Sequence, residues 1–288
     1  LSLVVRLLPL LDKQIEVKKI VVHGASLRMV RDANGKFNIG NIRQWINEPT
    51  ESGLFKFLRA SLMNQLMVED GAIDFQDYFN RSPDNPLSFN FRHIHFSIRK
   101  SFLESPFKFN IKGEIPIESS PTTFQVSGEF NNFYRDQDLS NIPINGKLRV
   151  NGLNVSTFKP YLKKELDNLP LDSILSLNSS FSGSLGGVKK AEGTLKYLTS
   201  SNREPQTLRD ARKPNHGEMK YQVSIDKDSL HIEGLKFKSD SFKFTAKGIV
   251  TNIYSRDPSV SFALASDLFQ INKSIEYIPL RFLFKGNH

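Results

Sequence analysis

The chain has 288 residues, with 39 Lys or Arg against 30 Asp or Glu and a formal net charge of +9. It has no cysteine, which excludes a disulfide framework and thiol chemistry. Its length suits one large or two ordinary domains, and because it begins with Leu1 rather than Met, we expect it to be part of a longer chain. The most apolar run, residues 1–11, is interrupted by Arg6 and Pro9 and is shorter than the ~20 apolar residues that a spanning helix needs.

The first predicted element is a hairpin around the sequence DANG, residues 32–35. Leu27 and Met29 before it, and Phe37 and Ile39 after it, occupy alternate positions. Asn-Gly suits a type I′ turn, in which both central residues have positive φ. The same letters resemble the start of a calcium loop, but the ladder of oxygen ligands is too short. We therefore interpret the sequence as a turn between two strands.

The next predicted element is a helix over residues 54–67, which carry leucines four positions apart. After it, Asp70 and Gly71 are interpreted as a second hairpin turn. The carboxylates of Asp70, Asp74 and Asp77 could form an acidic site, but a simpler interpretation places Asp74 on the solvent-facing side of a strand.

Alternation of apolar and polar residues predicts strands along most of the remaining chain. Residues 87–98 change phase between Phe91 and Ile94, which predicts a bulge or bend. His93 and His95 could hold zinc, but a structural zinc site needs four ligands and cysteine is absent, so no metal is expected. Further strands are expected at residues 107–117, 124–130, 147–150, 175–181, 223–225, 230–232, 242–250 and 260–264.

Two more helices are expected, one at residues 156–166 behind the N-cap Ser156 and one at 267–277 before Pro279. Residues 199–218 are polar and are interpreted as a long exposed loop, near which a sub-boundary of the domain would fall. A glycine recurs inside the predicted strands, as in NIKGEI, QVSGEF and TAKGIV. Such glycines let a sheet bend sharply, which favours a trough or a barrel.

The sequence contains no motif that indicates catalysis. A nucleophile elbow, a phosphate loop and a dinucleotide fingerprint are all missing, and no convincing pair of carboxylates suggests glycan processing. We therefore expect no enzyme activity and no cofactor. Basic residues alternate with acidic and polar ones rather than forming a block, so no nucleic acid partner is expected. A dispersed basic exterior suits anionic lipid head groups, and equally suits solubility alone.

The apolar side of the predicted strands is their most informative feature. The pattern alone favours the core of a sandwich or closed barrel first, and an open groove that holds lipid second. The candidate lining residues of such a groove are Phe89, Phe91, Phe107, Phe109, Ile111, Phe124, Val126, Val223, Ile225, Phe242 and Phe244.

Two short motifs near the N-terminus indicate a family. The first spans residues 15–39 and the second residues 67–78. The motif positions are Gly24, Leu27, Arg31, Asp32, Gly35 and Asn38 in the first, and Asp70, Gly71 and Asp77 in the second. Their order resembles the AsmA-like family of Gram-negative envelope proteins, which are bridge-like lipid transfer proteins. The motif residues are interpreted as structural turns rather than as catalytic groups.

The resemblance implies a mainly β fold, in which a strongly curled antiparallel sheet forms a taco-like apolar groove with a few short helices. It implies one elongated domain over residues 1–288, in the periplasm, held at the inner membrane by an anchor upstream of this chain. Phospholipid acyl chains would move along the groove between the inner and outer membranes. The alternative is an assembly or adaptor module for outer-membrane proteins that adds a strand at an exposed sheet edge.

Overall fold

The structure is a computed structural model that describes residues 1–5, 17–38, 65–79, 86–100, 106–117, 121–131, 141–156, 173–199, 215–239, 243–253 and 258–266. Within these ranges the chain forms β-strands and no α-helix, so none of the described residues belongs to a helix that could cross a membrane. The strands are β1 (Ser2–Val5), β2 (Val17–His23), β3 (Ser26–Arg31), β4 (Gln65–Asp77), β5 (Leu87–Arg99), β6 (Phe107–Ile115), β7 (Thr122–Phe130), β8 (Pro143–Asn154), β9 (Ser173–Ser184), β10 (Gly187–Thr199), β11 (Asn215–Asp226), β12 (Ser229–Ser239), β13 (Lys243–Thr251) and β14 (Ser259–Ser266).

The strands belong to one sheet that is not closed on itself. Its order is β1-β2-β4-β5-β6-β7-β8-β9-β10-β11-β12-β13-β14, with β3 beside β4. The prediction of a mainly β chain is therefore confirmed. The chain divides into two compact units, unit 1 (Leu1–Arg149 and Ser180–Lys189) and unit 2 (Val150–Ser179 and Lys190–His288).

The expectation of a purely antiparallel sheet is wrong at one place in unit 1. Both β2 and β3 run parallel to β4, whereas β1, β5, β6 and β7 pair with their neighbours in antiparallel fashion. Parallel neighbours need a long crossover connection, and residues 32–64 between β3 and β4 are long enough to supply one.

The helix predicted over residues 54–67 is wrong at its C-terminal end, because Gln65–Met67 belong to β4. Leu66 lies between Ile20 and Ile98 on the neighbouring strands, and this cross-strand burial outweighs the spacing of the leucines. The loop predicted at residues 199–218 also ends too late, because β11 begins at Asn215 and pairs with β10. Residues 54–64, 157–166, 200–214 and 267–277 lie outside the described part of the chain.

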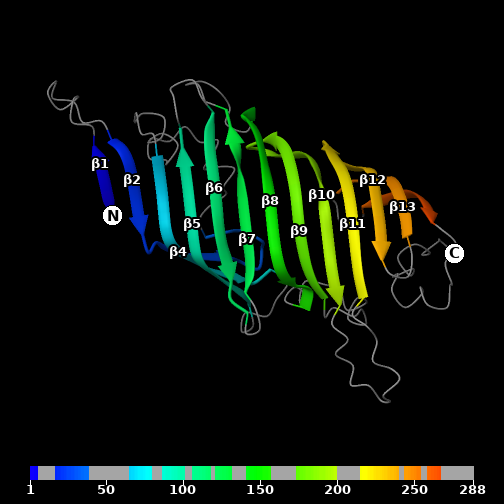
Figure 1. The fold of residues 1–288 in the computed structure, drawn as a ribbon, viewed down its shortest axis with the longest axis horizontal. Coiled ribbons are helices and arrows are strands. Elements are labelled where there is room, and N and C mark those ends of the chain that lie inside the picture. Colours follow the sequence, from blue (N-terminus) through cyan, green and yellow to red (C-terminus); the bar gives the residue numbers. More distant parts are fainter. Residues whose placement is uncertain are drawn as a thin grey trace, which may run out of the picture. The chain divides into compact units, whose positions relative to one another are not determined.

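In unit 1, the strand register places apolar side chains on one face and polar side chains on the other. Ile98 of β5 lies opposite Leu66 of β4 and Phe109 of β6, whereas Arg99 lies opposite Gln65 and Lys108. β4 to β7 lie side by side in this order (Figure 1). A buried apolar cluster of the unit consists of Leu66, Ile98, Phe107, Phe130 and Ile142, the last of which precedes β8.

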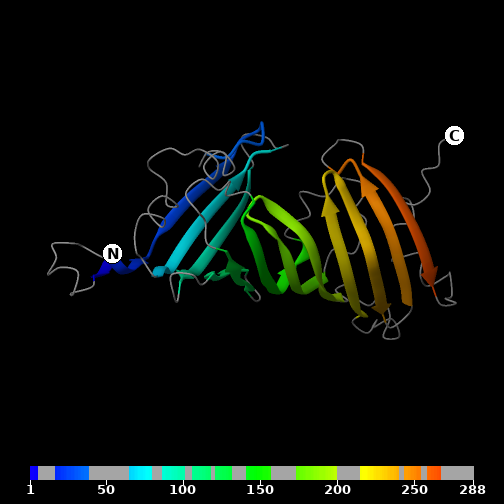
Figure 2. The same cartoon turned by 90° about the horizontal axis from the view of Figure 1, so that it is seen from above.

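In unit 2, β10 to β14 also place apolar side chains on one face and polar side chains on the other. The strands β11 to β14, in yellow to orange, lie side by side in Figure 2. Val223 of β11 lies opposite Ala191 of β10 and Ile232 of β12, while Ser224 lies opposite Lys190 and His231. The strands predicted at residues 223–225, 230–232 and 260–264 are confirmed.

A line of left-handed backbone crosses three neighbouring strand paths of unit 1. Gly24, between β2 and β3, has φ +61°, Asp70 in β4 has +54° and His93 in β5 has +49°. The register shifts at Asp70 and at His93, and their side chains meet, with Nδ1 of His93 2.8 Å from Oδ1 of Asp70. The bulge predicted in residues 87–98 is thus confirmed. The hairpin turn predicted at Asp70-Gly71 is wrong, because a second bulge absorbs the extra residue and β4 continues to Asp77.

Candidate functional site

The structure places the candidate lining residues of unit 1 on its apolar face. In β6 and β7, Phe107 lies opposite Phe130, Ile111 opposite Val126, and Phe124 opposite Gly113. The paired bulges keep this face continuous, since Phe91 lies opposite Ile73 on one side of them and Ile94 lies opposite Gly71 on the other. Of the candidates in unit 2, Val223, Ile225 and Phe244 lie on its apolar face, and Phe242 lies outside the described residues.

The candidate residues differ in exposure. Phe89 and Phe107 are 7% and 6% exposed and serve as core. The other described candidates are half-buried, as expected of side chains that pack sideways against neighbours while one surface stays open: Phe91, Phe109, Ile111, Phe124, Val126, Val223, Ile225 and Phe244. At the last described strand, β14, the apolar face is more open, and Val260, Phe262 and Leu264 are 54%, 45% and 57% exposed.

Two glycines inside the strands lie beneath an aromatic ring of a neighbouring strand, while the predicted bending stays a prediction. In unit 1, Phe124 of β7 lies over Gly113 of β6, and its ring meets that of Phe91 from β5 at a centroid distance of 5.9 Å. In unit 2, Tyr197 of β10 lies over Gly217 of β11 in the same way. None of the three glycines in the left-handed region is one of these. A missing side chain in the middle strand thus lets rings from the two flanking strands meet above it, as in pairs of glycine and aromatic residues known to stabilise sheets.

We expect Gly217→Val to lower the free energy of unfolding by about 1–3 kcal/mol, because the new side chain overpacks the face. A Cβ at residue 217 would overlap the ring of Tyr197, which stacks on Phe237 with ring centroids 5.9 Å apart. The near-ultraviolet circular dichroism of the stacked tyrosine should weaken together with the urea midpoint. Gly234→Val in the neighbouring strand is the matched control, because nothing lies within 4 Å of a Cβ there. Equal losses in both variants would contradict this role of Gly217.

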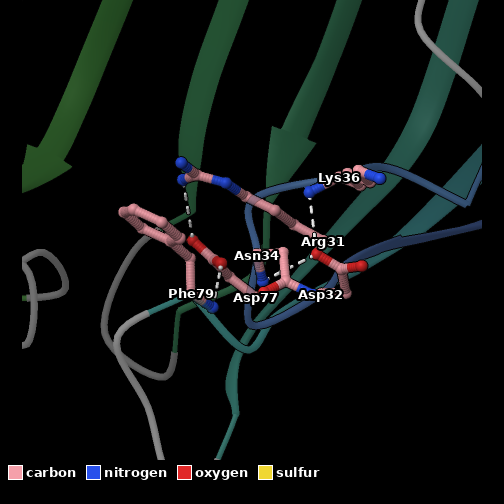
Figure 3. A network of polar contacts seen from close by, with 6 residues as sticks. All are labelled: Arg31, Asp32, Asn34, Lys36, Asp77 and Phe79. Carbon is pink, nitrogen blue, oxygen red and sulfur yellow. Dashed lines mark hydrogen bonds and ion pairs between the residues drawn. The ribbon is translucent and has the colours of Figure 1, made fainter.

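The first family motif forms a loop whose polar groups bond within it (Figure 3). Oδ1 of Asp32 accepts hydrogen bonds from the backbone N–H of Asn34 and Lys36, at 2.9 and 2.8 Å. Gly35 has φ +82°, but Asn34 isn't in the left-handed region. The hairpin is confirmed by the bridge between Arg31 and Phe37, and its predicted type I′ turn is wrong. It has a three-residue loop with glycine last, in which only the glycine needs positive φ.

The second motif supports the first through one buried carboxylate. Asp77, at the end of β4, is 1% exposed; its Oδ1 accepts the N–H of Phe79 at 2.9 Å, and its Oδ2 lies 3.5 Å from Nη1 of Arg31. The guanidinium of Arg31 lies 4.1 Å from the centroid of the Phe79 ring (Figure 3). This ring also lies against Gly35. The motifs therefore join the β3 hairpin to the end of β4.

Other polar candidates of the sequence have partners of their own. Nη2 of Arg92 lies 2.7 Å from Oδ1 of Asp74, and His93 lies between Asp70 and Glu114. In the described ranges, no three His, Cys, Asp or Glu side chains gather as metal ligands. What sequence reasoning missed is a cluster of cations around a cavity at the end of β2, β4 and β5, since these residues come from separate segments.

Residues 1–102 match the model of the AsmA family. This match confirms, over those residues, the resemblance that the two motifs predict. No curated protein and no solved structure matches the chain. The AsmA family is associated with the bacterial cell envelope, which suggests a role there in lipid transport or in assembly.

Proposed function

We propose that this chain holds phospholipid acyl chains on the apolar face of its sheet and passes them along that face between the inner and outer membranes. The observation that carries the proposal is that strand after strand presents half-buried apolar side chains to the same face, in each of the two units. An ordinary core would bury most of these side chains, whereas a face that receives acyl chains keeps them partly open.

The energetics suit a face that binds acyl chains but still lets them slide along it. Burial of each CH₂ contributes about 0.8 kcal/mol, so one acyl chain supplies ample holding energy. The strands β4 and β5 of unit 1 have 13 residues each and reach roughly 40 Å at 3.3 Å per residue. Where a ring lies over a glycine, as Phe124 does over Gly113, the middle strand adds no side chain against which an acyl chain would catch.

The same proposal places the protein in the periplasm. An anchor upstream of Leu1 would hold it at the inner membrane, and the apolar face would be the inside of a curled groove. The AsmA match of residues 1–102 supports an envelope role. The lining residues proposed to touch lipid are the half-buried candidates described above; Phe89 and Phe107 support them from the core.

The test is mass spectrometry of lipids that co-purify with the chain after gentle extraction. We expect near-stoichiometric phospholipid with the unmodified chain and at least about a tenfold loss with Ile111→Glu/Val126→Glu, because charged side chains oppose burial of an acyl chain. These residues lie opposite each other on the apolar face. The matched control is Asn110→Glu/Ser127→Glu, the adjacent opposite pair on the polar face. Lipid that is retained by a folded Ile111→Glu/Val126→Glu variant contradicts the proposal.

A second function has one observation in its favour. Among the described strands, β14 pairs only with β13, and all of its residues are exposed. A strand of this kind can pair with another chain, which is how an adaptor for outer-membrane proteins would work. Absence of lipid from a well-folded sample would favour this alternative.

A further inference from the structure

A cavity of about 400 Å³ in unit 1 is surrounded by cations. Its lining consists of Val4, Lys18, Lys19, Gln65, Arg99 and Lys100, from β1, β2, β4 and the end of β5. Four of these residues carry positive charge and none carries negative charge. The charge of the wall is therefore complementary to an anion.

The register explains why residues of β2, β4 and β5 meet at this cavity. Lys19 lies opposite Gln65, and Gln65 lies opposite Arg99, so the three form a row on the polar face. The row continues with Lys108 opposite Arg99. Lys18 would point to the other face of a regular strand, but the register of β1 and β2 shifts beside it, between Val4 and Val5. The irregular pairing allows two consecutive lysines to line one cavity.

The charges of this cavity lack counter-charges within the described part of the chain. None of its four cations forms an ion pair there with a carboxylate, whereas Arg31, Arg92, Lys196 and Lys220 each do. Like charges directly opposite each other, as at Arg99 and Lys108, are destabilising in a sheet. Burial lowers the pKa of Lys100 from its ordinary value. A bound anion would offset both unfavourable effects.

We propose that this cavity binds a phosphate group, held by Lys19, Arg99 and the amide of Gln65, with Lys18 and Lys100 at its rim. A guanidinium offers paired donors that match phosphate oxygens, and lysine adds compact charge. The amide nitrogen of Gln65 lies 3.1 Å from Sδ of Met67 and retains a second N–H for the ligand.

The position of the cavity indicates which phosphate compound fits. Leu66 and Ile98, the chain neighbours of Gln65 and Arg99, belong to the buried apolar cluster, and Nζ of Lys100 lies 5.1 Å from the ring centroid of Phe107 in the same cluster. A lipid head group could therefore occupy the cavity while its acyl chains reach the apolar face around the strand ends. The inference that the phosphate belongs to a lipid head group rests on the proposed function. The inference that the cavity binds a phosphate group does not.

The experiment is isothermal titration calorimetry of the full chain with dioctanoylphosphatidate below its micelle concentration, at about 50 mM salt to limit screening. We expect Lys19→Gln/Arg99→Gln to weaken binding at least about tenfold, as loss of two charge-assisted contacts predicts. Lys236→Gln/Lys238→Gln removes the same charge from the polar face of β12 and should change the affinity less than about twofold. Lys18→Gln/Lys100→Gln at the rim serves as a second variant if the first fails to fold.

The outcomes distinguish whether the cavity binds phosphate from whether that phosphate belongs to a lipid. If inorganic phosphate competes with phosphatidate, a phosphate group alone is sufficient for binding. If phosphatidate binds and inorganic phosphate does not compete, the ligand is a lipid head group. Equal weakening by the cavity and control variants, or weakening by neither cavity variant, overturns the site. If phosphate binds through the cavity but no version of the chain co-purifies with lipid, the lipid-transfer function fails while the phosphate site stands.

Discussion

Phe130→Ala should lower the free energy of unfolding by about 3–4 kcal/mol, because it removes a ring from the buried apolar cluster of unit 1 and leaves a cavity. Phe130 is 5% exposed, stacks on Phe107 with ring centroids 5.2 Å apart, and lies 6.2 Å from the ring of Phe109. Urea denaturation followed by far-ultraviolet circular dichroism measures the change. The loss should appear without any ligand, since the cluster is packed by the protein itself.

The matched control is Phe262→Ala in β14, whose side chain is 45% exposed. It should cost less than about 1 kcal/mol, because little of its surface is removed from water. The contrast distinguishes a packed end of the apolar face from an open one. A loss at Phe262 as large as that at Phe130 would mean that the apolar face is an ordinary core throughout, and the lipid-holding proposal would lose its main support.

The strands and their apolar faces were predictable because they depend on short-range alternation. Phe107, Phe109 and Ile111 alternate with polar residues, and the register places all of them on the apolar face. The bulge in β5 was also visible, since one extra residue separates Phe91 from Ile94. The matching bulge in β4 could not be predicted, because Asp70-Gly71 has the composition of a turn. Only the pairing with β5 shows that the strand continues.

Features that depend on contacts between distant segments could not be predicted from the sequence. The parallel pairing of β2 and β3 with β4 depends on a crossover whose path no local pattern specifies. The contact between Phe91 and Phe124 above Gly113 joins three strands, so the glycine alone suggested only a bend. The cation-lined cavity likewise exists only because Lys19, Gln65 and Arg99 share one register row.

The second large effect is expected at Asp77, where Asp77→Ala should cost about 2–3 kcal/mol. The substitution leaves the N–H of Phe79 without its acceptor and Arg31 without its carboxylate. Asp74→Ala in the same strand is the control. Its ion pair with Arg92 is shorter, at 2.7 Å, but the two side chains are 42% and 36% exposed, so the loss should stay below about 1 kcal/mol.

A double-mutant cycle between Asp77→Ala and Arg31→Ala decides how the motif acts. If the two motifs stabilise the protein by joining the β3 hairpin to β4, the two losses should overlap by at least about 0.5 kcal/mol. Lipid that co-purifies with a folded Asp77→Ala variant should be unchanged, because neither side chain belongs to the proposed lining. Additive losses would show that each residue acts alone. A selective loss of lipid at unchanged stability would instead place these motif residues in lipid handling.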